Sequence, residues 1–407
     1  MKIIIIPDSF KGTLSSLEVC ETIEKSLSEH DTVIVPAADG GEGTLEAFAH
    51  AKAGMPFSQA QLITVPAKDA CGNDIDACYM MAGNVAVIEM AKIAGFTEAA
   101  GAEGEPGSLV MNGSTFGVGM LMKDAISRGA RKVVVGLGGS CTNDGGCGMA
   151  AAMGVKFLDA SGRSFIPTGK SLNEITLVDN SAAISLLAAD ASLFHSKIDI
   201  VGMSDVNNPL LGPKGAAHIF APQKGASPNE VELLERGLEN LVSQISDGIV
   251  CRTVSGFEAA QNLSGSWAEK LAALPGSGAA GGMGYGIRAL LAGRLENGID
   301  MFLNAINFEE LLFDADYVIT GEGSFDSQSL GGKTVSGICR RAKKADVPVI
   351  LVAGIAKTDE KDLEKLGIVK CFETGVLDFS QTPEEIKKAA FANLGKAANE
   401  IVNFIGK

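Results

Sequence analysis

Short apolar runs alternate with amphipathic helical patterns at both ends of the chain. Residues 3–6 are four isoleucines, residues 14–27 place apolar side chains at helical spacing, and residues 32–35 form the next apolar run. An apolar run followed by an amphipathic helix is typical of a buried parallel strand and its crossover helix. Residues 317–320, 347–352 and 368–372 repeat this order, and a Lys- and Ala-rich helix is predicted from about Pro383. We therefore predict that the two ends of the chain contribute to one parallel sheet.

The middle of the chain has a different pattern. It predicts strands at residues 75–81, 85–90 and 132–137, a helix at 115–127 and a long polar-faced helix at 228–249. A chain of 407 residues is too long for one ordinary core. We therefore expect an α/β protein of two domains with mostly parallel sheets. Residues 1–68 plus 285–407 form a discontinuous domain in this interpretation, and residues 69–284 form a second α/β domain inserted into it.

Composition and charge narrow the class of ligand. There are 34 Lys and Arg against 49 Asp and Glu, which gives a net charge of -15 and repels nucleic acid and anionic membranes. No run approaches the roughly 20 apolar residues that a membrane span requires, and the apolar N-terminus is too short for a signal peptide. The eight cysteines show no C-x-x-C or zinc-finger spacing. We therefore expect a soluble, cytoplasmic protein with free thiols that acts on a small molecule.

A glycine-rich acidic turn follows the second predicted strand. Residues 38–44 read ADGGEGT and precede a predicted helix. Backbone N–H groups and the helix dipole at such a place favour an anion, while Asp39 or Glu42 is available for metal or base chemistry. The alternative is an ordinary turn whose carboxylates cap the helix.

The densest glycine stretch is GLGGSCTNDGGCG at residues 136–148, between a predicted strand and an Ala-rich helix. Ser140, Thr142, Asn143 and Asp144 offer the mixed donors and acceptors of a polyol or phosphate site. Nothing basic flanks the two cysteines of this stretch, which favours small buried hydrophobes over reactive thiols.

Two polar segments follow the predicted strand at residues 198–201. In the first, SDVNNPLL at residues 204–211, Asp205 and Asn208 are suited to hydroxyls or a metal, although Asn-Pro is also a common turn dipeptide. In the second, APQKGA at residues 221–226, Lys224 is suited to an anionic ligand, although an isolated lysine is more often exposed. His218 is more often packed or exposed at such a position than catalytic.

Three further segments resemble ligand loops. Residues 275–284, PGSGAAGGMG, carry no charge, so they offer a phosphate nest, close packing of two elements or a hinge. Residues 320–334 end in GGKT, but position 327 is serine where a P-loop requires glycine, and Asp326 stands where a dinucleotide fingerprint requires its third glycine. Asp8, Ser9 and Lys11 follow the first predicted strand, where ligands of open α/β sheets bind.

Taken in order, these motifs resemble the bacterial type I glycerate kinases, the family that includes glycerate 2-kinase, over essentially the whole chain. The resemblance implies ATP-dependent phosphorylation of D-glycerate, at the 2-hydroxyl, by an enzyme with one flavodoxin-like domain and its active site in the interdomain cleft. Cys141 stands where we expect alanine in the family, and both side chains are small. A nucleotide-dependent dehydrogenase and a non-catalytic sugar-acid sensor are the alternatives.

The resemblance also implies roles for individual residues. We expect Asp144 or Asp39 to accept the substrate proton, Lys11 to neutralise phosphate, and ATP with Mg²⁺ to be the cofactors. The expected D-glycerate ligands are Ser140, Asn143, Asp205, Asn208 and Lys224. The expected nucleotide ligands are Gly40, Gly41, Gly281, Gly282, Gly321, Gly323 and Lys333, and the expected metal ligands are Glu322 and Asp326.

Overall fold

The computed structural model describes residues 1–10, 12–50, 59–95, 108–188, 198–245, 264–326 and 334–406, which fold into two compact units. Unit 1 comprises Met1–Asp39, Glu46–Ser58 and Gly298–Lys407, and unit 2 comprises Gly40–Leu45 and Gln59–Asn297. These divisions differ from the expected boundaries at residues 68 and 285. The reason is that β3 (Gln61–Lys68) pairs with β4 (Asp74–Ala82), and β11 (Arg294–Glu296) pairs with β10 (Asp199–Met203), both within unit 2.

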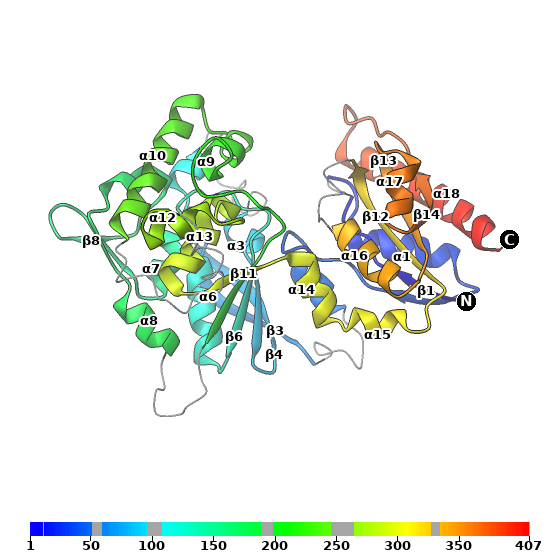
Figure 1. Cartoon of the computed structure of the whole chain (residues 1–407), viewed down its shortest axis with the longest axis horizontal. Coiled ribbons are helices and arrows are strands. Elements are labelled where there is room, and N and C mark those ends of the chain that lie inside the picture. The colour runs from blue at the N-terminus through cyan, green and yellow to red at the C-terminus, as the bar shows by residue number, and fades with distance from the viewer. Residues whose placement is uncertain are drawn as a thin grey trace. The chain divides into compact units, whose positions relative to one another are not determined.

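Unit 1 contains a five-stranded sheet in the order β14-β13-β12-β1-β2, with all neighbours parallel. Figure 1 labels β1 from the start of the chain together with β12, β13 and β14 from its last third. Numbered along the unit, the order is 2-1-3-4-5, which is that of flavodoxin-like folds and has its switch point between β1 and β12. The prediction that both chain ends share one sheet is confirmed. The strands are β1 (Lys2–Ile5), β2 (Asp31–Ile34), β12 (Tyr317–Phe325), β13 (Val349–Ala356) and β14 (Ile368–Glu373).

Helices cover this sheet at positions that local capping defines. α1 (Ser16–Ser26) begins where the Glu18 N–H donates to Ser15 Oγ at 3.2 Å and the Ser15 N–H donates to Glu18 Oε2 at 2.9 Å. α18 (Pro383–Ile405) begins at the same kind of capping box and packs against α1 on one core. The other described helices are α2 (Thr44–Ala49), which continues from unit 2 into unit 1, α14 (Gly298–Ala305), α15 (Phe308–Leu312), α16 (Thr334–Lys344) and α17 (Glu360–Lys365).

The expected glycine loop at residues 321–323 is wrong, because β12 runs straight through it. Gly321 and Glu322 pair with Val352 and Ala353 of β13. A Cβ on Gly321 would lie 2.1 Å from the Val352 carbonyl oxygen, so Gly321 permits close contact between the strands, and the segment does not form a turn. The helix expected after this strand, α16 (Thr334–Lys344), begins at Thr334, and residues 327–333 before it lie outside the described residues.

Unit 2 contains a six-stranded sheet in the order β11-β10-β6-β5-β4-β3. β11, β10, β6 (Lys132–Gly136) and β5 (Val85–Glu89) are parallel, and β4 and β3 continue the sheet antiparallel. The expected strands at 75–81, 85–90, 132–137 and 198–201 are therefore present, each within two residues. A small antiparallel sheet, which the sequence did not indicate, consists of β8 (Ser164–Phe165), β7 (Lys156–Leu158) and β9 (Leu177–Asp179).

α6 (Phe116–Ser127) packs on the antiparallel side of this sheet, and α13 (Ala279–Leu291) packs on β10 and β11. α10 (Pro228–Gln244) confirms the start of the expected long helix, and residues 246–249 of that prediction lie outside the described residues. The remaining elements of unit 2 are α3 (Ala91–Ala94), α5 (Ser108–Asn112), α7 (Cys147–Ala152), α8 (Ser181–Ala188), α9 (Ala216–Phe220), α12 (Trp267–Ala273), η1 (Gly169–Glu174) and η2 (Pro222–Lys224).

Both units thus confirm an α/β fold with mostly parallel sheets. No helix among the described residues is long and apolar enough to span a bilayer. Seven cysteines lie in the described segments and all are free thiols, whereas Cys251 lies outside them.

Candidate functional site

The carboxyl ends of the parallel strands gather most of the predicted residues of unit 2 at one edge of its sheet. Residues 137–146 follow β6, and residues 204–210 follow β10. The loops begin side by side, because the Leu137 N–H donates to the Met203 carbonyl at 3.1 Å and the Met90 N–H donates to the Gly136 carbonyl at 3.2 Å. Ligands of open α/β sheets bind at this edge.

The acidic glycine turn at residues 40–45 lies on the same edge. The Gly138 N–H donates to the Gly40 carbonyl at 2.9 Å. Gly40 has a φ of +94°, and a Cβ there would lie 2.4 Å from the Met203 carbonyl oxygen, so no larger residue fits. The contacts place Gly40 and Gly41 against the ends of β6 and β10.

Glu89, the last residue of β5, holds this turn and was not identified from the sequence. Its side chain is fully buried, and its carboxylate accepts the Gly43 N–H at 3.1 Å and the Leu45 N–H at 2.9 Å. Burial raises the pKa of Glu89, and these two hydrogen bonds act in the opposite direction. The Gly43 and Leu45 N–H groups are therefore used within the protein by Glu89. The only sequence signal was a carboxylate ending an otherwise apolar strand.

Asp144 lies inside the loop after β6 and is fully buried. Its Oδ2 accepts the Thr115 N–H at 2.8 Å, the Thr115 hydroxyl at 2.7 Å and the Gly148 N–H at 3.1 Å, and its Oδ1 accepts the Gly146 N–H at 3.0 Å. Burial raises the pKa of Asp144, and the four hydrogen bonds act in the opposite direction. These contacts tie the loop to the start of α6 and the start of α7.

Lys224 lies beneath the same loop. It is 6% exposed, and its ammonium donates to Ser140 Oγ at 3.0 Å and to the Thr142 carbonyl at 2.7 Å. Burial lowers the pKa of Lys224 to about 8. The alternative of a solvent-exposed lysine is therefore wrong, and the structure brings together Ser140, Lys224 and the backbone next to Asn143.

Asn143 and Thr142 carry polar atoms with no acceptor or donor in the described part of the chain. Both residues are fully buried, and neither the Asn143 amide oxygen and nitrogen nor Thr142 Oγ1 makes a hydrogen bond there. Buried amides and hydroxyls are costly to leave unpaired, which makes these atoms suited to a polar ligand or ordered water.

Asp205 and Asn208 occupy the loop after β10. Both are half-buried, and the Asn208 side-chain amide donates to the Lys214 carbonyl at 2.8 Å. The Asn208 carbonyl in turn accepts the Gly278 N–H at 3.0 Å. Asn208 therefore links the 204–214 loop to the start of α13.

Gly281 and Gly282 pack against the 142–145 loop, which is the packing alternative that the sequence left open. Gly281 has a φ of +64°, and a Cβ there would lie 2.1 Å from the Thr142 carbonyl oxygen. The Gly145 N–H donates to the Gly281 carbonyl at 3.0 Å. Ala280, next to them, has a φ of +53°, which is unusual for a residue with a side chain. This left-handed turn supports the loop that carries Asn143 and Asp144.

The two cysteines of the loop after β6 and His218 are also placed by the structure. Cys141 and Cys147 are fully buried, and burial raises the pKa of Cys141 to about 11, as expected for unreactive thiols. His218 Nδ1 lies 3.5 Å from Glu235 Oε2, and its Nε2 lies 3.5 Å from Glu232 Oε1.

In unit 1, the predicted metal ligands lie at the carboxyl end of β12, beside the switch point. Glu322 is half-buried within the strand, and Asp326 follows its last residue. The Asp8 N–H, after β1, donates to the Gly321 carbonyl at 2.8 Å, so both loops start together. No cluster of three or more potential metal-binding side chains occurs among the described residues. Two carboxylates nevertheless suit Mg²⁺, which binds through one or two carboxylates plus phosphate oxygens.

Three predicted site residues are not placed with the others. Asp39 is half-buried and belongs to unit 1, although its neighbour Gly40 belongs to unit 2. Lys11 and Lys333 lie outside the described residues.

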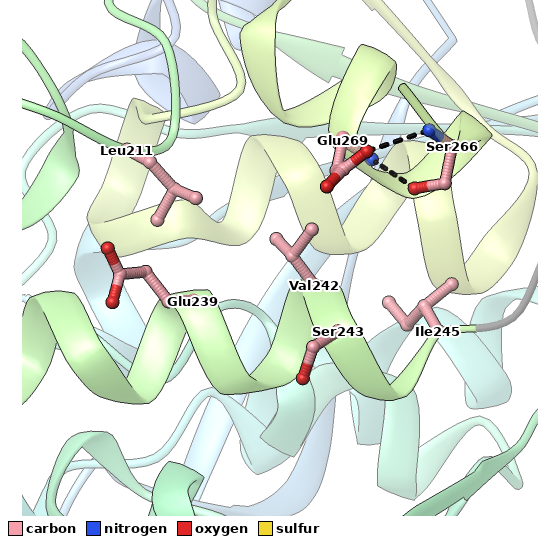
Figure 2. A pocket seen from close by; sticks show the side chains of 7 residues that line it. All are labelled: Leu211, Glu239, Val242, Ser243, Ile245, Ser266 and Glu269. Atoms are coloured by element: carbon pink, nitrogen blue, oxygen red, sulfur yellow. Dashed lines mark hydrogen bonds between the residues drawn. The ribbon is translucent and has the colours of Figure 1, made fainter.

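None of the predicted site residues lines the pocket of unit 2 shown in Figure 2. It lies between the end of α10 and the start of α12 and is lined by Leu211, Glu239, Val242, Ser243, Ile245, Ser266 and Glu269. Two carboxylates in its wall disfavour phosphate or carboxylate ligands. It is therefore not the candidate site for an anionic substrate.

Comparison with known proteins identifies the family. Residues 3–406 match the model of the glycerate kinase family. The chain is 38% identical to glycerate kinase of Bacillus subtilis over 91% of this chain and 90% of that one, and 36% identical to glycerate 2-kinase of Escherichia coli K12 over 98% and 97%. A crystal structure assigned to glycerate kinase 2 of Salmonella typhimurium LT2 superposes with a TM-score of 0.76 at 32% identity and covers 100% of this chain and 98% of that chain. The chain therefore belongs to the glycerate kinase family.

Proposed function

We propose that the protein transfers the γ-phosphoryl group of ATP to D-glycerate, at the 2-hydroxyl, and so produces 2-phospho-D-glycerate. The observation that carries this proposal is the family match over residues 3–406, and glycerate 2-kinase is among the similar proteins. The dehydrogenase alternative lacks a dinucleotide fingerprint, and the sensor alternative does not explain similarity to kinases along the whole chain.

In this proposal, D-glycerate binds at the carboxyl edge of the unit 2 sheet. Ser140, Asn143 and Lys224 provide buried donors and acceptors for a small polar acid, and Asp205 and Asn208 follow the neighbouring strand. Direct contacts hold the substrate in position for phosphoryl transfer, which is the main task of a kinase site.

The two candidate bases now differ. Four hydrogen bonds already use the carboxylate of Asp144, so we propose that it positions the loop and that Asp39 steers the substrate hydroxyl proton. Asp39 is half-buried and starts the turn that Glu89 fixes.

Gly40, Gly41, Gly321 and Gly323 remain proposed nucleotide ligands. Lys11 and Lys333 remain candidates for the phosphates, and Gly281 and Gly282 act by supporting the substrate loop. Glu322 and Asp326 would hold Mg²⁺, which neutralises phosphate charge when bound. The free thiols of the described chain suit the reducing cytoplasm, where we expect the enzyme to act.

Incubation with D-glycerate, ATP and Mg²⁺ tests the proposal. ADP should appear only when all three are present, and phosphorus NMR should show 2-phosphoglycerate. Addition of EDTA in excess of Mg²⁺ should stop the reaction. If ADP does not rise above the rate without glycerate, the kinase proposal fails, and if 3-phosphoglycerate is the product, the assigned position fails.

A further inference from the structure

Lys224 is a buried cation whose hydrogen bonds are incomplete. Its ammonium carries three N–H donors, and the described residues accept two of them, at Ser140 Oγ and the Thr142 carbonyl. Both acceptors are neutral. The residue is only 6% exposed, so bulk water does not solvate the charge well.

No carboxylate of the described chain pairs with this ammonium within 4.0 Å. Asp144 is near enough to favour the charged form of Lys224, but its oxygens accept four other donors. A buried charge without an ion pair is costly, and a site that keeps one is prepared for an anion.

The surroundings suit a small hydroxy acid. Ser140 is 7% exposed and next to Gly139, which is exposed and has a φ of +74°, so the loop opens to solvent at this point. Asn143 contributes buried amide atoms that have no partner among the described residues. One remaining ammonium donor matches one singly charged carboxylate, whereas a nucleotide polyphosphate would require several cations.

We propose that Lys224 binds the carboxylate of the substrate and thereby selects hydroxy acids over neutral polyols such as glycerol. This inference rests on the proposed function and adds to it the group that recognises the acid. A carboxylate beside Lys224 favours its protonated form, so binding takes up protons once the free protein has begun to lose that charge.

The titratable groups around Lys224 are few among the described residues. Cys141 and Asp144 face it from the loop after β6. η2 packs on α9, where His218 interacts with Glu232 and Glu235 of α10. Burial lowers the pKa of Lys224 to about 8 and raises the pKa of Cys141 to about 11, so Lys224 titrates first as the pH rises above neutrality.

Calorimetric titration with D-glycerate, without nucleotide, tests the proposal. At pH 8, in two buffers of different ionisation enthalpy, the wild-type protein should take up about half a proton per site, because about half of the free lysine is neutral there. The Lys224→Met variant should lose this uptake and bind at least about thirtyfold more weakly. It should also lose the preference for D-glycerate over glycerol. Lys214→Met, which changes an exposed lysine of the same unit, should behave as wild type.

The possible results separate this inference from the proposed function. Binding by Lys224→Met within threefold of wild type, or with the same proton uptake, overturns the inference even if the enzyme turns over. Binding with uptake but without ADP formation leaves the inference standing and removes the proposed function. If Lys224→Met does not fold, the wild-type protein provides the test, since its affinity should fall about tenfold per pH unit between pH 8.5 and 10. A flat profile overturns the inference.

Discussion

Replacing Asp144 by asparagine distinguishes loop support from base catalysis. The buried carboxylate accepts three donors on Oδ2 and one, the Gly146 N–H, on Oδ1. An asparagine keeps one acceptor oxygen, which can serve Thr115 and Gly148, but its amide NH₂ then faces the Gly146 N–H. One buried donor loses its acceptor, and the charge-assisted character of the other bonds is lost.

The expected cost follows from these contacts. An unsatisfied buried donor costs about 1–3 kcal/mol, and weakening of the remaining bonds adds to this, while removal of a buried charge offsets a part. We expect Asp144→Asn to lower the free energy of unfolding of unit 2 by about 2 kcal/mol. Turnover should fall as well, because the loop that carries Ser140 and Asn143 loses its anchor.

Trp267 makes this measurable in unit 2 alone, since it is the single tryptophan of the chain and starts α12. Urea unfolding followed by its fluorescence should show the loss. Asp159→Asn is the matched control, because that carboxylate also accepts backbone and side-chain donors but lies on a solvent-exposed hairpin. It should change stability by a small fraction of this amount. Unchanged stability of Asp144→Asn together with abolished turnover would show that Asp144 does not support the loop and would return it to the role of base.

Three further outcomes are expected. Glu89→Gln keeps only one acceptor oxygen for the Gly43 and Leu45 N–H groups, so steady-state kinetics of this variant should show kcat/KM lowered about tenfold or more. A variant with the kcat/KM of the wild type would show that the turn does not need this anchor. Gly281→Ala should lower the free energy of unfolding of unit 2 by about 2 kcal/mol or more, of which roughly 1 kcal/mol comes from its positive φ and the rest from contact with the Thr142 carbonyl. Gly212→Ala is the control, because Gly212 also has a positive φ, of +85°, but open space around it, and it should cost only about 1 kcal/mol. Equal costs of the two substitutions in urea unfolding would contradict the packing of Gly281 on Thr142. As the pH rises from about 8 to 10.5, the folded protein loses the Lys224 proton before the unfolded chain does. The free energy of unfolding of the wild type should therefore rise by up to about 3 kcal/mol relative to that of Lys224→Met in unfolding titrations. A pH-independent difference between the two proteins would disprove the burial of this charge.

The elements that could be predicted from the sequence depend on local signals. The capping residues Ser15 and Thr382 stand directly before α1 and α18, and each has its glutamate three residues later. The apolar runs of β1, β6 and β10 are also legible because these strands are buried on both faces.

The errors come from contacts between distant residues. Gly321 resembles a loop glycine, but its partner Val352 on β13 shows that it permits close pairing of strands. Asp144 resembles a base until Thr115, 29 residues earlier, supplies two of its donors. Glu89 was missed for the same reason, since the turn that it holds lies 44 to 46 residues before it.

A crystal structure of the protein with D-glycerate and a non-hydrolysable ATP analogue would show where the substrate acid binds. We expect the glycerate carboxylate within hydrogen-bonding distance of Lys224 Nζ and the glycerate hydroxyls near Asn143. Glycerate bound at the switch point of unit 1, or anywhere else remote from the loop after β6, would contradict this expectation.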